Sequence, residues 1–178
     1  MKIGIVVGSI REGRVGDSIG AWVAEHAAQH EGVTAQIVDL ADFDLPFFTG
    51  VTPPSMLNKE YDNAAAQAFS AAIDDCNAFI FVTPEYNGSV PGAFKNAIDH
   101  IAPEWKNKPV GFVGYSYHGG LGAIKHWRDI MQILGSCPVD AQVSLTLGSD
   151  VEDGAVKESV QTLTDLETML TQLTEAQG

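Results

Sequence analysis

Short apolar runs alternate with helical patterns along the whole chain, and this alternation restricts the possible folds more than any other feature of the sequence. The run 78–82, Ala-Phe-Ile-Phe-Val, is continuously apolar, as expected for a strand covered on both faces. Strands that alternate with helices form a parallel sheet through right-handed crossovers. Strands are expected over residues 2–7, 34–39, 78–83, 109–115 and 138–146, and helices over 18–30, 57–75, 91–102, 121–135 and 152–174. The sequence therefore predicts an α/β fold with a five-stranded parallel sheet.

One domain is expected over residues 1–178, because a chain of this length can bury one core and no repeat, low-complexity tract or linker divides it. Residues 44–58 form the one long irregular connection, and such loops are often functional or lie at interfaces. The alternative is an ordinary crossover in which Phe47 and Phe48 fill the core. Ser149 and Glu152 predict a capping box for the last helix.

Three of the expected strands end in glycine-rich polar loops, at residues 8–16, 84–92 and 116–122. In an open parallel sheet, ligands bind at the carboxyl ends of the strands, near the point where the strand order reverses. In the order 2-1-3-4-5 that point lies between the first and third strands, and the fourth strand is adjacent. We therefore predict a flavodoxin-like, doubly wound sheet of this order with a crevice for one flat cofactor.

The first loop has the composition of an anion site. Its glycines allow close backbone approach, the following helix presents free N–H groups, and Arg11 and Arg14 can bind phosphate oxygens. An ordinary solvated arginine pair is the alternative. Asp17 or Ser18 is expected to cap the helix. A nucleotide-hydrolysing P-loop is disfavoured, because Val15 stands where a Ser or Thr would bind Mg²⁺, so a mononucleotide phosphate is the expected anion.

The second and third loops carry aromatic side chains that suit a planar ligand. Ser89 and Pro91 supply helix-start chemistry after the second loop. Tyr86 and Tyr117 are expected either to pack on a flat ring system or to pack in the core or at the rim of the crevice. His118 is either a catalytic proton donor or a solvated loop residue, and the sequence leaves both possibilities open.

Composition excludes several classes of function. The formal net charge of -13 disfavours binding to nucleic acid and to anionic membranes. Cys76 and Cys137 lack ligand spacing and are expected to be small buried residues of a reduced protein, and the histidines show no metal-ligand spacing. There is no signal-peptide pattern and no apolar run near the roughly 20 residues of a membrane span. A soluble, cytoplasmic protein without a bound metal is expected.

These segments together resemble the NADPH-dependent FMN reductase family. The resemblance rests on GSIR at 8–11, PEYNGSVPG at 84–92, KNAID at 95–99 and the glycine pair at 119–120, and it covers nearly the whole chain in order. It implies a flavodoxin-like fold, a homodimer or homotetramer, and tightly held FMN. It also implies that NADPH or NADH reduces small-molecule acceptors such as flavins, quinones, azo compounds or metal oxyanions.

The resemblance also implies which residues hold FMN. They are Ser9, Arg11, Arg14, Val15 and Gly16 around the phosphate, Pro84, Glu85, Tyr86, Asn87 and Gly88 at the isoalloxazine edge, and Ser116, Tyr117, Gly119 and Gly120 on the third side. Many members of the family have Ser and Asn where this chain has Arg14 and Gly16. No catalytic nucleophile is expected, because the cofactor carries the redox chemistry and the protein positions it.

Hydride is expected to pass from NAD(P)H through bound FMN to an acceptor by a ping-pong mechanism, since the sequence offers one crevice and no second nucleotide fingerprint. A non-enzymatic electron carrier and a flavin-binding regulatory protein are the alternatives. The acidity of the chain favours a carrier, whereas the arginines of the first loop favour a reductase.

The sequence leaves the subunit contact open. Trp105 and Trp127 lie near the ends of the helices that follow the second and third loops, where they either anchor a homo-oligomer or are buried within one chain. Lys95 and Asp99 form either a weak surface pair on one helix or part of a subunit contact.

Overall fold

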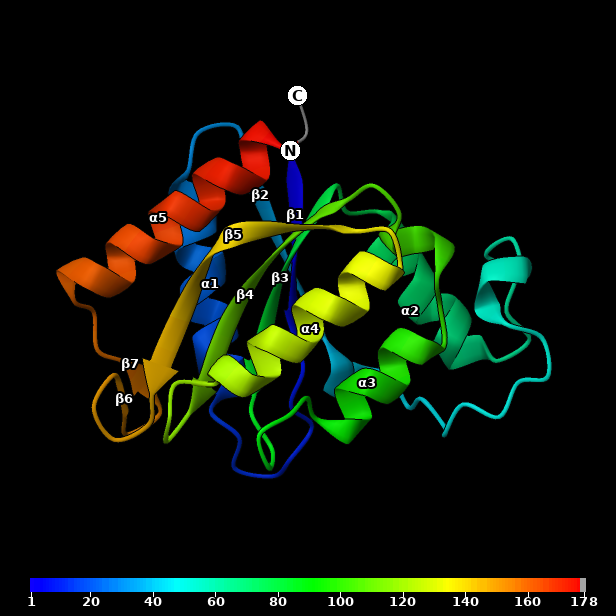
Figure 1. Cartoon of the computed structure of the whole chain (residues 1–178), viewed down its shortest axis with the longest axis horizontal. Helices are drawn as coiled ribbons and strands as arrows, with labels where there is room; N and C mark the ends of the chain where they lie inside the picture. The colour runs from blue at the N-terminus through cyan, green and yellow to red at the C-terminus, as the bar shows by residue number, and fades with distance from the viewer. Residues whose placement is uncertain (177–178) are drawn as a thin grey trace.

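The computed structural model describes residues 1–176, and within them a five-stranded parallel sheet of order β2-β1-β3-β4-β5 forms the centre of the molecule (Figure 1). The strands are β1 Lys2–Val7, β2 Thr34–Asp39, β3 Ala78–Pro84, β4 Pro109–Ser116 and β5 Cys137–Thr146. The α-helices are α1 Gly16–Gln29, α2 Ala64–Asp74, α3 Gly92–Asp99, α4 Leu121–Ile133 and α5 Val160–Glu175. The flavodoxin-like strand order predicted from the sequence is confirmed.

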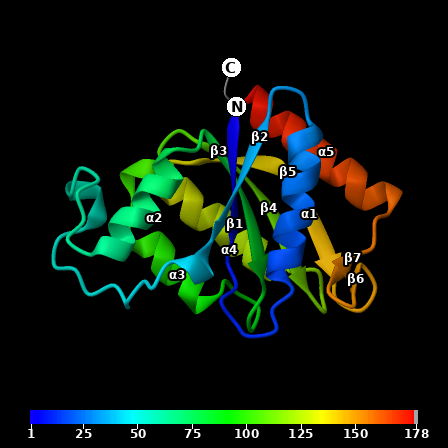
Figure 2. The same ribbon diagram turned by 180° about the vertical axis from the view of Figure 1, so that it is seen from behind.

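Helices cover both faces of the sheet. Helices α2, α3 and α4 lie on one face, and α1 and α5 lie on the other (Figures 1 and 2). Every residue of β3 is buried, as expected for the continuously apolar run 78–82. The core under α1 and α5 is mainly aliphatic, whereas aromatic side chains dominate the core under α2, α3 and α4.

The two tryptophans considered as subunit anchors belong to this aromatic core. Trp105 and Trp127 are fully buried, and their ring centroids lie 5.7 Å and 5.4 Å from that of Phe81. The indole Nε1 of Trp127 donates a hydrogen bond to Oγ1 of Thr83 at 3.0 Å. Burial within one chain is therefore the correct alternative, and neither side chain can anchor a subunit contact.

Helix α2 begins at Ala64, whereas the sequence placed its start near residue 57. Residues before it form the short 3-10 helix Pro54–Met56, after which Asn58 and Lys59 take positive φ angles of 49° and 65°. Such angles interrupt a helix. The side chain of Asn63 then caps α2 by accepting a hydrogen bond from the backbone N–H of Ala66 at 2.9 Å.

The last helix also begins later than predicted, at Val160 rather than residue 152. A small hairpin of β6, Val151–Glu152, and β7, Ala155–Val156, takes the intervening residues. Asp153 and Gly154 join these strands with φ angles of 50° and 78°, which a continuing helix cannot accommodate. The predicted capping box is wrong, because Ser159 and Thr162 form it instead.

The irregular segment 44–58 is bound to α3. Asn96 accepts a hydrogen bond from the Phe48 N–H and donates one to the Pro46 carbonyl, both at 2.9 Å. The His100 ring nitrogen Nε2 lies 2.7 Å from the same carbonyl oxygen. Phe47 is nevertheless 85% exposed, so the alternative in which Phe47 fills the core is wrong. The contacts with α3 and His100 involve the backbone of Pro46 and Phe48, and the side chain of Phe47 between them is exposed to solvent.

Cys76 is buried as expected, but the prediction for Cys137 is wrong. Cys137 is exposed, because it is the first residue of the edge strand β5. Neither cysteine forms a disulfide in the part of the chain that the structure describes. Among residues 1–176, no helix combines the length and apolar character required to cross a membrane.

Candidate cofactor site

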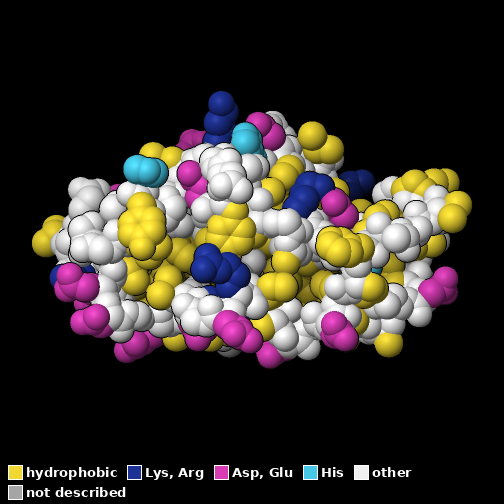
Figure 3. Space-filling view, turned by 90° about the horizontal axis from the view of Figure 1, so that it is seen from below, with side chains coloured by type: hydrophobic (Ala, Val, Ile, Leu, Met, Phe, Trp, Pro, Cys, Tyr) yellow, Lys and Arg dark blue, Asp and Glu magenta, His cyan; other side chains and the backbone are white. Residues whose placement is uncertain are grey.

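The three glycine-rich loops meet at the carboxyl edge of the sheet, where the chain leaves β1, β3 and β4 (Figure 1). Figure 3 looks onto this edge and shows hydrophobic side chains around a basic group near its middle. The loops enclose a crevice of about 340 Å³. Its lining contains the predicted residues Ser9, Arg11, Arg14, Val15, Pro84, Glu85, Tyr86, Ser116 and Tyr117. The crevice thus brings together side chains from all three predicted loops.

A larger hollow of about 660 Å³ lies between α1 and α5, but it is at the wrong end of the sheet. Its lining includes Gln29 and His30 at the end of α1, and a helix that follows a parallel strand ends near the amino edge of the sheet. No group of three or more His, Cys, Asp and Glu residues within the described range 1–176 is arranged to hold a metal ion. The crevice is the candidate site because all three predicted loops line it at the carboxyl edge of the sheet.

The first loop is tightly packed beneath the start of α1. The N–H of Gly8 donates to the Val82 carbonyl at 2.9 Å, and a Cβ atom at Gly8 would lie 1.9 Å from the Phe94 ring. The sequence assigned the helix cap to Asp17 or Ser18, but α1 begins at Gly16 and its N-cap is Val15. Among the described residues, no side chain caps the helix at Val15, but Oδ1 of Asp17 accepts a hydrogen bond from the N–H of Ser18 at 2.9 Å. The N–H groups of Gly16 and Asp17 therefore remain for an anion.

Arg14 has a protein partner. Its Nη1 and Nη2 atoms donate to Oδ1 and Oδ2 of Asp39 at 2.7 Å and 2.5 Å, and Nη1 also donates to the Ser9 carbonyl. Each side chain of the Arg14–Asp39 pair is only 16% exposed. The hydrogen bond with Asp39 is the main cause that raises the pKa of Arg14. The Arg14 guanidinium, which the sequence analysis assigned to phosphate binding, is thus neutralised by Asp39 at the end of β2.

Arg11 has a different environment. It is exposed at the mouth of the crevice, and its guanidinium carbon lies 5.7 Å from the centroid of the Tyr86 ring. The two arginines that the sequence placed together therefore serve different contacts. Arg14 fixes the shape of the first loop, and Arg11 carries positive charge over the entrance.

The second loop ends in a tight hairpin. Asn87 and Gly88 have φ angles of 54° and 75°, and Tyr86 and Ser89 exchange backbone hydrogen bonds at 3.0 Å and 3.1 Å. Asn-Gly is the preferred pair for such a turn, because both central residues need positive φ. The hydroxyl of Tyr86 lies 3.2 Å from Oγ of Ser9 in the first loop. Tyr86 therefore faces the crevice, while Asn87 and Gly88 form the exposed tip.

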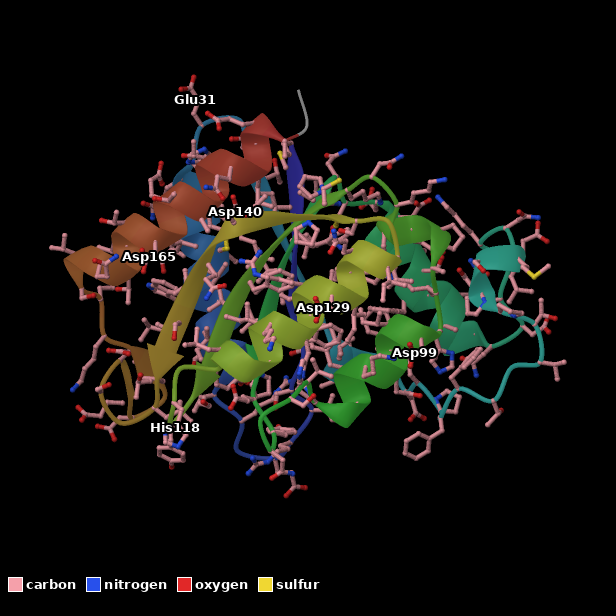
Figure 4. All side chains as sticks on the ribbon, in the orientation of Figure 1. Glu31, Asp99, His118, Asp129, Asp140 and Asp165 are labelled. Atoms are coloured by element: carbon pink, nitrogen blue, oxygen red, sulfur yellow. The ribbon has the colours of Figure 1, made fainter. Side chains whose placement is uncertain are left out.

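The third loop is organised by Ser116, whose Oγ accepts hydrogen bonds from the N–H groups of His118 and Gly120, each at 3.0 Å. Gly119 and Gly120 have φ angles of 80° and 72°, and a Cβ atom at Gly120 would lie 2.4 Å from the Tyr115 nitrogen. Gly119 and Gly120 allow the third loop to turn tightly, but they do not themselves line the crevice. Tyr117 is 75% exposed, and His118 is exposed at the loop tip, on the lower edge of the molecule in Figure 4.

Tyr115 and Leu147 also line the crevice, although the sequence analysis did not select them. Tyr115 is only 4% exposed, and its hydroxyl would lie 2.6 Å from a Cβ atom at Gly16. Burial is the main cause that raises the pKa of its phenol, and a hydrogen bond with Ser9 acts in the opposite direction. The position of Tyr115 directly before the third loop could have identified it as a lining residue. Leu147 could not have been identified in this way, because it follows β5, whose loop is not one of the three glycine-rich loops.

Proteins with similar sequences are FMN reductases or FMN-dependent reductases that use a nicotinamide co-substrate. The family model described as NADPH-dependent FMN reductase matches residues 1–150. An NAD(P)H-dependent FMN reductase of Saccharomyces cerevisiae is 35% identical over 166 residues, covering 85% of this chain and 87% of the relative. An NAD(P)H-dependent FMN reductase of Nectria sp is 32% identical over 171 residues, covering 90% and 85%. An FMN-dependent NADPH-azoreductase of Staphylococcus aureus is 32% identical over 165 residues, covering 87% and 83%.

Solved structures agree with the fold. The flavoenzyme NAD(P)H:(acceptor) oxidoreductase FerB of Paracoccus denitrificans superposes with a TM-score of 0.78, at 20% identity and with 98% of each chain covered. A flavodoxin of Streptococcus pneumoniae superposes with a TM-score of 0.63, at 14% identity, with 98% and 99% covered. At these identities the likeness concerns the fold alone, which enzymes and carriers share. The sequence matches decide the family: this chain belongs to the NADPH-dependent FMN reductase family, whose oxidoreductases combine FMN with a nicotinamide co-substrate.

Proposed function

We propose that this chain is an FMN-dependent NAD(P)H oxidoreductase that delivers reducing equivalents to small-molecule acceptors. The observation that carries the proposal is the crevice between the three loops, which the cation Arg11 and Val15 at the start of α1 line together with the aromatic side chains of Tyr86 and Tyr117. Positive charge and a helix start beside aromatic rings suit a phosphate joined to a flat ring. Family membership supports the same cofactor.

The residues present fit FMN. In our proposal the phosphate binds at the first turn of α1, where the N–H groups of Gly16 and Asp17 need acceptors and Arg11 supplies charge. A Cβ atom at Gly16 would lie 2.6 Å from the Tyr115 hydroxyl and one at Gly120 would lie 2.4 Å from the Tyr115 nitrogen, so these glycines allow the first and third loops to pack closely on Tyr115 at the crevice. The ring is proposed to lie between the second and third loops. The other residues proposed to contribute are Ser9, Arg14, Val15, Pro84, Glu85, Asn87, Gly88, Ser116 and Gly119.

Bound FMN would supply the two-electron chemistry that connects a nicotinamide to an acceptor. The protein contributes orientation: Ser9 and Tyr86 join the first and second loops, and the Ser116 hydroxyl holds the third loop in shape. Backbone N–H groups of these loops can stabilise negative charge at the ring without rearrangement. Because the nicotinamide and the acceptor would use the same crevice, we propose that they bind in turn. The mechanism would then be ping-pong.

We propose flavins, quinones or azo compounds as acceptors, since planar molecules suit an aromatic mouth and one relative is an azoreductase. A homodimer or homotetramer is also proposed, because Ile10, Phe47, Tyr117 and Leu121 expose apolar surface at or beside the site. The free cysteines agree with a cytoplasmic location, which we likewise propose.

Anaerobic mixing with NADPH tests the proposal. The purified protein should show the absorption bands of oxidised flavin, and NADPH alone should bleach them, whereas a carrier would need a partner reductase. Initial rates with varied NADPH and a quinone should give parallel double-reciprocal lines, and intersecting lines would require both substrates to bind together. Light scattering at micromolar concentration should give at least twice the monomer mass. A colourless protein that takes up no FMN would refute the proposed function.

A further inference from the structure

We infer that Glu85 is a positioning residue, which acts through α4 to hold the second loop and to set the charge beside the cofactor. The inference rests on the proposed function, because it assigns a role toward bound FMN. Family resemblance places Glu85 at the isoalloxazine edge, but its carboxylate contacts the protein. Oε2 accepts a hydrogen bond from the Gly122 N–H at 2.7 Å, and the Ala123 N–H lies 3.4 Å away.

Helix α4 depends on this carboxylate for its cap. Its N-cap residue is Gly120, in the left-handed conformation, and within the described chain no side chain at that position caps the helix. The first N–H groups of a helix need acceptors, which a serine, threonine or aspartate at the N-cap commonly supplies. Here Glu85 supplies the acceptor from a loop 37 residues earlier in the sequence. The start of α4 and the second loop are therefore one connected unit.

The packing around the contact is close. A Cβ atom at Gly122 would lie 2.8 Å from the Gly88 carbonyl oxygen and 2.9 Å from Oε2 of Glu85, so glycine is needed for the loop to approach the helix. About one turn further along α4, Nδ1 of His126 lies 2.9 Å from Oγ of Ser89. The hairpin that carries Tyr86 is thus attached to α4 at both of its ends.

Two consequences follow for the site. Because the third loop leads directly into α4, the Glu85 contact couples the two loops between which the ring is proposed to lie. Glu85 also lines the crevice, and its carboxylate balances the positive end of the α4 dipole. Negative charge beside a redox group opposes its reduction, so removing the Glu85 charge should make bound FMN easier to reduce.

Two substitutions separate the hydrogen bond from the charge. Glu85→Gln keeps an acceptor oxygen and removes the charge, whereas Glu85→Ala removes both. Asp129→Asn is the matched control, because Asp129 is an exposed carboxylate on the same helix (Figure 4). Each protein is measured by amide hydrogen exchange at Gly122 and Ala123 without cofactor, and by FMN affinity and midpoint potential in the loaded protein.

Glu85→Ala should speed exchange at Gly122 and Ala123 about tenfold or more and weaken FMN binding about tenfold. Glu85→Gln should keep FMN affinity within about threefold and raise the potential by about 30 mV, which is a tenfold change for a two-electron couple. Asp129→Asn should match the wild type. Unchanged exchange in Glu85→Ala, or an unchanged potential in Glu85→Gln, would overturn the inference. If the wild type binds no FMN, the proposed function and the inferred role toward FMN both fail. Unchanged exchange with normal FMN binding refutes the inference alone.

Discussion

Replacing Arg11 by alanine is expected to weaken FMN binding through loss of a phosphate contact. A hydrogen bond to a charged group contributes about 1.5 to 3 kcal/mol, and exposure of Arg11 places it at the lower end of that range. In the unbound protein Arg11 contacts the Tyr86 ring, an interaction of about 0.5 kcal/mol that binding would replace in part. The net loss is therefore about 1 to 1.5 kcal/mol, which corresponds to a factor of about 5 to 12 in affinity.

Flavin fluorescence provides the assay, with FMN and riboflavin titrated against the same protein. Riboflavin has no phosphate, so Arg11→Ala should leave its affinity within about twofold. The FMN affinity of the wild type should fall with added salt, and that of Arg11→Ala should fall less steeply. Lys106→Ala is the matched control, because Lys106 is an exposed cation outside the crevice. Equal losses for FMN and riboflavin, or no loss for FMN, would refute the placement of the phosphate at Arg11.

Three further substitutions test the local structure. Arg14→Ala should lower the free energy of unfolding by about 1 to 3 kcal/mol in urea titrations, because it leaves the partly buried Asp39 carboxylate unpaired. Asn87→Leu should cost about 1 to 2 kcal/mol in the same assay, whereas Asn87→Gly should be nearly neutral, since residue 87 has a φ of 54°. Burial and the hydrogen bond to Glu104 raise the pKa of Tyr61. The raised pKa means that the neutral Tyr61 phenol stabilises the folded state below about pH 10, and that this contribution is lost as the pH rises further. The free energy of unfolding of Tyr61→Phe should therefore fall less steeply above pH 10 than that of the wild type.

Each of these expectations has a contrary result. A fully stable Arg14→Ala protein with weakened FMN binding would mean that Arg14 serves the phosphate rather than Asp39. Equal stability of the two Asn87 variants would show that the turn relaxes without strain. For Tyr61, identical stability curves of wild type and Tyr61→Phe between pH 8 and pH 11 would place the alkaline transition elsewhere, for example at Tyr115, whose pKa is also raised by burial.

Local sequence patterns were sufficient for the architecture of the sheet. The continuously apolar run 78–82 predicted a strand buried on both faces, and β3 is such a strand. The positions of the glycine-rich loops predicted the strand order, because ligand loops follow the strands next to the switch point. Asn87 and Gly88 likewise indicated a tight turn, since their preference for positive φ is local. These features depend on residues that are close together in the chain.

Only the tertiary structure decided which partners the site residues have. Arg14 binds Asp39, 25 residues away, and Glu85 caps α4 from 37 residues away, so no local pattern could assign either contact. The burial of Trp105 depended equally on packing among distant elements. Arg14 and Glu85 each pair with a group of opposite charge or with free N–H groups that only the folded chain brings within hydrogen-bond distance. The sequence determined which loops meet at the carboxyl edge of the sheet, and the tertiary contacts determined which of their charges remain available to a cofactor.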